Sequence, residues 1–218
     1  MLGTQNKWLF TQADMLSAHI SLWDLCHTPA GGNLEDKNFL WGNNYRYNLA
    51  SLCEDLLEPI IDFYGRPLVV LKGMSWVERS IDKKNKEVIY KGLDIWGLRD
   101  RQLREYDGSS LHTTGSAANF LVPGVPARDV WEYCRKIHLF YGELSYCFNK
   151  ELGMDYVHIA LPSYHRGLTY GQVRDTSIDK RGRVRTKLLE ETTPPLVGSG
   201  NTAAYLLPSG VFRFAEGK

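Results

Sequence analysis

The sequence predicts an α+β fold in which helices pack on one face of a small antiparallel sheet. Apolar residues recur at three- and four-residue spacing over 49–64, as on one buried face of a helix. Short apolar or β-branched runs at 67–71, 117–122, 144–148 and 156–161 have the length of strands. Helices precede most of the strands, and a single helix opened by Pro126 interrupts them, an order that favours α+β over a repeating βαβ pattern.

The long helix over 49–64 has identifiable ends. Asn43 or Asn44 can cap its start, because a short polar side chain accepts hydrogen bonds from the first free backbone N–H groups. Gly65 supplies a left-handed turn at its end, and Pro67 cannot continue a helix. We therefore expect one well-delimited helix here.

Other segments give weaker signals. Phe10–Asp14 is expected to begin a short helix that runs to about Ser17, with Thr11 as its cap and Asp14 closing a capping box. Residues 28–43, rich in Gly, Asn and Pro, are expected to form a loop. Residues 80–109 are charged and irregular, and they are expected to form a solvated loop, with a hairpin around Lys83, Lys84 and Lys86 as the alternative.

The composition changes beyond Pro162. The sequence predicts a domain over residues 1–162 and an irregular, partly β extension over residues 163–218, which is rich in Gly and Pro. Its basic residues alternate with others as in a strand with one charged face. Two interpretations stay open: a solvated edge strand whose charges discourage aggregation, or a docking site for an acidic partner or polyanion. This basic cluster consists of Lys180, Arg181, Arg183, Arg185 and Lys187.

Overall charge and hydropathy exclude several partners. The 218 residues carry a formal net charge of +1, which does not indicate a nucleic-acid partner. No stretch approaches the ~18–20 apolar residues that span a bilayer, so no membrane partner is expected. The start of the chain lacks a basic segment followed by an apolar run, so no signal peptide is expected.

The four cysteines favour folding in a reducing cytoplasm. None belongs to a C-x-x-C pair, which argues against a cysteine zinc site. Cys53 and Cys134 lie on apolar helix faces and Cys147 in an apolar strand, where free cysteine behaves as a small hydrophobic residue.

One group of residues could form a metal site. His112 lies where a loop enters a strand, and His158 lies in another strand. Two histidines on neighbouring strands can share a metal ion, with ring nitrogens about 2.0–2.1 Å from zinc. A third ligand seven residues after the first, at Asn119, would come from the same strand. A carboxylate three residues before His158, Asp155, can take a proton from metal-bound water.

These two segments resemble motifs of the zinc D-Ala-D-Ala carboxypeptidase and L-alanyl-D-glutamate endopeptidase family, in its phage-type branch. The resemblance covers about residues 10–162 and implies the Hedgehog/DD-peptidase fold. The family's carboxylate-x-x-H motif is matched by Asp155 and His158. Its S-x-H-x-x-G-x-A-x-D motif is matched by Ser110, His112, Gly115 and Ala117.

The resemblance also implies roles for individual residues. His112 and His158 would bind zinc, together with the residue at position 119. Asp155 would be the general base of a peptidoglycan peptidase. Ser110 would support the first strand or contact substrate.

Two departures from the family pattern bear on activity. Asn119 stands where the family has an aspartate ligand, and an amide offers an oxygen but no negative charge. Loss of even an outer-shell partner costs ~10–100-fold in metal affinity, so we expect weak or absent zinc. The family's substrate-binding arginine after the strand at 67–71 is also missing, because the chain reads Lys72-Gly-Met-Ser there. Lys72 and Arg79 are the candidate replacements.

Two functions remain open from the sequence. The first is a degenerate peptidase-like domain reused as a structural or binding component of a phage particle, with other phage structural proteins or peptidoglycan as partners. The second is an active zinc metallopeptidase that cleaves peptidoglycan stem peptides. In both, the protein would be made in the host cytoplasm and directed to the virion or the cell wall. The altered ligand at Asn119 favours the first.

Overall fold

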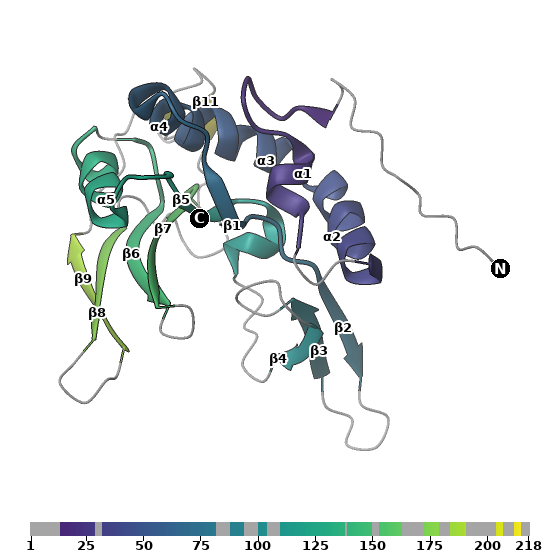
Figure 1. The fold of residues 1–218 in the computed structure, drawn as a ribbon. Coiled ribbons are helices and arrows are strands. Elements are labelled where there is room, and N and C mark those ends of the chain that lie inside the picture. Colours follow the sequence, from purple (N-terminus) through teal and green to yellow (C-terminus); the bar gives the residue numbers. More distant parts are fainter. Residues whose placement is uncertain are drawn as a thin grey trace.

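A computed structural model gives the fold of the chain (Figure 1). Side chains are described up to Trp76 and, with gaps, from Ser110 to Leu189. The described residues are 14–28, 32–81, 88–93, 100–103, 110–137, 139–149, 153–162, 172–178, 184–190, 204–206 and 212–214.

The fold is α+β and centres on a six-stranded mixed sheet, in the order β1-β5-β7-β6-β8-β9. Neighbouring strands are antiparallel except β6 and β8, which are parallel. The expectation of a purely antiparallel sheet is wrong at this one pairing. Strand β8 follows β7 in the sequence, but it pairs with the other edge of β6. It runs opposite to β7, and because β6 also runs opposite to β7, β8 and β6 are parallel. The strands are β1 (Val69–Lys72), β5 (Ala117–Leu121), β6 (Glu143–Asn149), β7 (Met154–Ala160), β8 (Gln172–Ile178) and β9 (Val184–Glu190).

The predicted long helix is a continuous helical run of three pieces. It comprises α3 (Arg46–Leu52), a π-helical turn η2 (Cys53–Leu57) and α4 (Glu58–Tyr64). Gly65 ends the run in the left-handed conformation, with φ 59°, as predicted. The predicted caps at Asn43 and Asn44 are wrong, because both residues belong to the preceding helix and Tyr45 occupies the cap position.

Residues 28–43 were expected to form a loop, but α2 spans Gly32–Asn44. Tertiary contacts outweigh the low helix propensity of the Gly and Asn residues. The buried Asn38 amide donates to the carbonyls of Cys26 and Met74 and accepts from the backbone N–H of Trp76. At Gly42, an added Cβ would lie 2.3 Å from the Cys26 sulfur, so helix α1 (Leu22–Cys26) packs directly against this backbone.

The short helix predicted from Phe10 to about Ser17 lies largely outside the described residues. Within the described part, residues 16–19 form a bend instead of a helix. The helix that follows is α1, and Ser21 caps it in a capping box with Asp24.

Helices and sheet enclose one main core. Helix α5 (Ala127–Lys136), which follows Pro126 as predicted, packs against β6 and β7. Figure 1 shows α2, α3 and α4 along the side of the sheet away from β8 and β9. The sheet face turned to the helices is apolar and fully buried. It contributes Ala118, Phe120, Leu144, Val157, Ile159 and Val173.

The segment 80–109 contains strands, so the expected solvated loop is wrong and the alternative of a hairpin agrees with the antiparallel pairing of β2 and β3. A three-stranded antiparallel sheet has the order β2-β3-β4. A separate antiparallel pair, β10 and β11, lies near the end of the chain. The bounds are β2 (Val77–Ile81), β3 (Val88–Leu93), β4 (Asp100–Leu103), β10 (Ala204–Leu206) and β11 (Phe212–Phe214).

The predicted extension beyond Pro162 contributes to the main sheet through β8 and β9. The strand predicted from alternating basic residues is present as β9, which forms one edge of the sheet. Arg185 and Lys187 are exposed on it, while Lys180, Arg181 and Arg183 lie outside the described residues.

All four cysteines are free thiols. Cys53 and Cys134 are buried as the apolar patterns indicated, Cys26 is buried as well, and Cys147 is half-buried. Among the described residues, none of the helices has the length and apolar character needed to cross a bilayer.

Candidate functional site

His112 lies in a tight turn packed between helices and sheet. The turn is the 3-10 helix η3 (Leu111–Thr114), and the Ser110 carbonyl before it accepts bonds from the Thr113 backbone N–H and hydroxyl. Gly115 ends the turn with φ 66°, a conformation that favours glycine. An added Cβ there would lie 2.9 Å from Leu49 Cγ, so the turn also packs tightly on α3. This explains the glycine at the matched motif position.

Hydrogen bonds from three segments hold the turn in place. Trp41 Nε1 on α2 donates to the Thr113 carbonyl at 2.8 Å, and Asn48 Nδ2 on α3 donates to the Thr114 carbonyl at 2.8 Å. The Ser75 backbone N–H donates to the His112 carbonyl at 3.0 Å. Two helices near the start of the sequence, α2 and α3, thus hold the backbone that carries His112.

We expect Trp41→Phe to lower the free energy of unfolding by about 1 kcal/mol, because it removes one half-buried hydrogen bond and little apolar surface. Urea denaturation would measure the change. Leu40→Ala, at the neighbouring and 69% exposed position, is the control and should stay within about 0.5 kcal/mol of the natural chain. Equal losses in the two variants would contradict the role given to the indole.

The His112 ring is held in one tautomer. Its Nδ1 lies 2.8 Å from the Gly73 carbonyl oxygen, which can only accept, so Nδ1 carries the proton. Burial, then the nearby charges of Lys72 and His158, lower the pKa of His112 well below its usual value. The ring is therefore neutral at pH 7, and its Nε2 presents an unprotonated lone pair.

His158 and Asn119 meet on the face of the sheet opposite the core. Asn119 on β5 and His158 on β7 are direct cross-strand partners, and Asn119 is also paired with Lys72 on β1. His158 Nδ1 lies 2.8 Å from Asn119 Oδ1, which accepts its proton. The ring centroids of His112 and His158 are 5.3 Å apart. The structure thus brings together the three residues predicted as metal ligands.

The Asn119 amide interacts with His158. Its Oδ1 accepts the His158 Nδ1 proton, and an aspartate at this position could accept the same proton while adding a negative charge. His112 Nδ1 donates to the Gly73 carbonyl, so the Nε2 lone pair is the atom of that ring that a ligand could contact.

Asp155 does not join the two histidines. Side chains alternate along a strand, so residues three apart point to opposite faces. On β7, Asp155 shares the helix-covered face, where Tyr146 Oη donates to its carboxylate. Arg128 of α5 stacks over Tyr146 and forms a bidentate ion pair with Asp175 at 2.7 and 3.1 Å. The expected position of Asp155 beside the metal ligands is therefore wrong.

The acid beside the histidines is Glu143, which the motif comparison missed. Its Oε2 lies 3.6 Å from His158 Nε2 and 3.3 Å from an Arg174 guanidinium nitrogen. Glu143 is 6% exposed, at the start of strand β6, which is mainly apolar. A glutamate in such a run is the sequence signal for it, because buried carboxylates need polar partners.

The remaining predicted residues lie at the margin of this group. Lys72, at the end of β1, is half-buried and close enough to influence the pKa of His112. Ser110 supports the η3 turn through its carbonyl. Arg79 lies in β2, and its side chain is outside the described part of the chain.

The group does not fit the zinc site that the resemblance implies. His112, His158 and Asn119 offer no negative charge, and the Asn119 amide oxygen is engaged with His158. Among the described residues, one group of three His, Cys, Asp or Glu residues has ligand atoms within 4.8 Å of one another, and it consists of His19, Glu58 and Asp62. His112, His158 and Glu143 do not meet that distance.

Comparison with known proteins identifies no relatives. The chain matches no family model, and it has no significant match among curated proteins or solved structures.

Proposed function

We propose that this protein is a degenerate peptidase-like domain that serves as a binding or structural component of a phage particle and does not hydrolyse peptides. The observation that carries the proposal is Asn119, an uncharged amide at the expected anionic ligand position, whose Oδ1 accepts the His158 Nδ1 proton. The assignment to phage rests on the resemblance of the Ser110–Asn119 and Asp155–His158 segments to the phage-type branch of the family.

The placement of Asp155 supports the same conclusion. A general base must lie within hydrogen-bonding reach of the proton that it takes. Asp155 instead accepts from Tyr146 on the face covered by α5. Its role there is to hold β6 and β7 under the helix, which a binding domain needs as much as an enzyme does.

An active zinc peptidase is the second candidate, and Glu143 favours it. This buried acid is 3.6 Å from His158 Nε2, on the same face as both histidines. Such an acid could replace Asp155 as general base. Against this, Glu143 already contacts the Arg174 guanidinium, and the ligand set has no anion.

The two candidates are separated by an assay on muropeptides. We expect the natural chain to release no peptide from purified peptidoglycan, with or without added zinc, and to sediment with the peptidoglycan if that is its partner. Cleavage that is lost in Glu143→Gln or in Asp155→Ala would overturn the non-catalytic proposal. The two variants would then also show which acid acts as base.

A further inference from the structure

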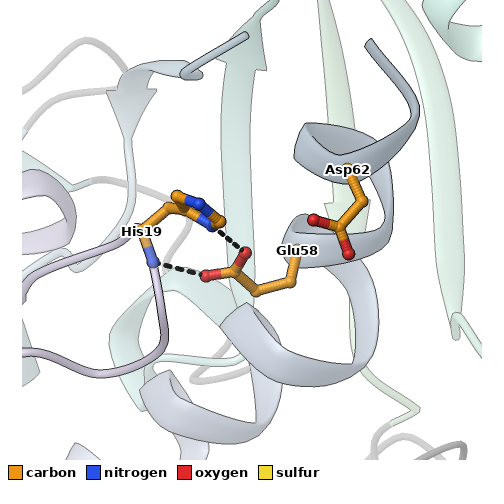
Figure 2. A group of neighbouring side chains, drawn as sticks. All are labelled: His19, Glu58 and Asp62. Atoms are coloured by element: carbon orange, nitrogen blue, oxygen red, sulfur yellow. Dashed lines mark hydrogen bonds and ion pairs between the residues drawn. The ribbon is translucent and has the colours of Figure 1, made fainter. Parts of the chain in front are cut away.

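A second group of potential metal ligands lies far from the histidine pair in sequence, and Figure 2 shows it. His19, in the bend before α1, reaches the surface of α4. Its ring Nδ1 lies 2.7 Å from Glu58 Oε2, and its backbone N–H donates to Glu58 Oε1 at 2.8 Å. Asp62 follows one turn later on the same helix, and one ligand atom of each residue lies within 4.8 Å of the others.

The bend that carries His19 is held by its own hydrogen bonds. The backbone N–H groups of Leu16 and Ser17 both donate to the Ile20 carbonyl, at 2.8 and 3.2 Å. Together with the two bonds from His19 to Glu58, they fix the ring against the helix. His19 and Glu58 are therefore placed before any ion arrives, which reduces the ordering cost of binding.

Charge favours a cation at this position. Burial alone would raise the pKa of Glu58, but the nearby Ser17 hydroxyl and the contacts with His19 outweigh it and lower the pKa. The Glu58 side chain is 13% exposed, so its charge is largely removed from water. Asp62 adds a second carboxylate facing the same ring, and it contributes to raising the pKa of His19. The carboxylates of Glu58 and Asp62 thus both favour a positive charge at the His19 ring.

The pair His27–Glu35 serves as a comparison, because it is a histidine–glutamate contact without a third ligand nearby among the described residues. His27 Nδ1 lies 2.6 Å from Glu35 Oε1, and the His27 ring stacks on Trp23 at 4.3 Å between centroids. Within the described part of the chain, no third ligand joins this pair at metal-binding distances. The group around His19 differs by Asp62, which is not needed for the His19–Glu58 contact.

We propose that His19, Glu58 and Asp62 bind a divalent ion of the zinc class at the protein surface. One imidazole and two carboxylates are ligands that zinc accepts, at about 2.0–2.2 Å. The 54% exposure of His19 leaves room for water or a further ligand to complete the coordination. The ion replaces the proton between His19 and Glu58 and joins the bend to α4. This site is independent of the histidine pair on the sheet.

The test is a zinc titration by calorimetry, using the full chain and zinc chloride at pH 7. Asp62→Asn is the informative variant, because it keeps the His19–Glu58 ion pair and removes a ligand. We expect it to weaken zinc binding roughly 10–100-fold. Glu54→Gln, at an exposed acid of the same helical run, is the matched control and should bind as the natural chain does.

The outcomes distinguish this site from the sheet. Unchanged affinity in Asp62→Asn, or no zinc binding by the natural chain, would overturn the proposal and leave His19–Glu58 as an ion pair only. His158→Gln should leave the titration unchanged. If His158→Gln loses zinc binding and Asp62→Asn keeps it, both this proposal and the proposed non-catalytic function are wrong. If Asp62→Asn alone loses zinc binding, both are supported.

Discussion

Asn119→Asp is expected to convert the histidine pair into a zinc site, while the natural chain binds little zinc there. An aspartate can still accept the His158 Nδ1 proton, and it supplies the negative charge that the natural group lacks. His112 Nδ1 donates to the Gly73 carbonyl, so its Nε2 lone pair can bind a metal ion beside that carboxylate. We therefore expect a gain in zinc affinity of at least roughly 10–100-fold.

The test measures the metal content and the zinc affinity of the group formed by His112, Asn119 and His158. Both chains should carry Asp62→Asn, so that zinc at the surface group does not contribute. Asn119→Ala is the matched control, since it removes the amide without adding charge, and it should gain no zinc. If the natural chain already holds stoichiometric zinc in the Asp62→Asn background, the assignment of Asn119 as the group that replaces the metal is wrong.

Gly73→Ala is expected to have the largest effect on stability and to disturb His112 as well. An added Cβ would lie 2.5 Å from the Leu25 carbonyl oxygen and 2.8 Å from Leu25 Cα, so α1 must move away from the end of β1. The neighbouring Met74 N–H donates to the same carbonyl at 2.6 Å and would be strained. Overpacking of this kind costs about 1–3 kcal/mol, and a clash with backbone places it at the upper end.

Two readouts separate this effect from a general loss of stability. Urea denaturation measures the change in the free energy of unfolding. Imidazole resonances of His112 report on the bond to the Gly73 carbonyl, which the substitution displaces. Gly65→Ala is the comparison, because that residue has φ 59° with no atom near an added Cβ. It should lose about 1–2 kcal/mol from backbone strain and leave His112 unchanged. Unshifted His112 resonances in Gly73→Ala would contradict the predicted coupling.

Periodicity and breaker residues determined much of the fold before any coordinates. The apolar spacing over 49–64, the glycine at 65 and the runs at β1, β5, β6 and β7 reflect local constraints that each segment carries by itself. The motif spacing also brought His112, Asn119 and His158 together, because a turn and two adjacent strands leave few other arrangements.

Tertiary contacts decided what the local pattern could not. Helix α2 forms in a Gly- and Asn-rich segment because Asn38 bonds to distant backbone groups and Gly42 allows α1 to approach. The direction of β8 depends on which strand it reaches, and composition does not encode that. Strand alternation moved Asp155 to the core face, while cross-strand pairing placed Glu143 beside His158.

By itself, the sequence determined the long helix, the strands β1, β5, β6 and β7, the histidine pair and the missing charge at Asn119, since these follow from side-chain chemistry and spacing. Only the tertiary structure decided which face each carboxylate occupies, that the Asn119 amide accepts from His158, and that His19 meets Glu58 and Asp62. The physical reason is that hydrogen bonds and ion pairs act over a few ångströms, and the residues involved are 31 or more positions apart or on strands whose register only folding sets.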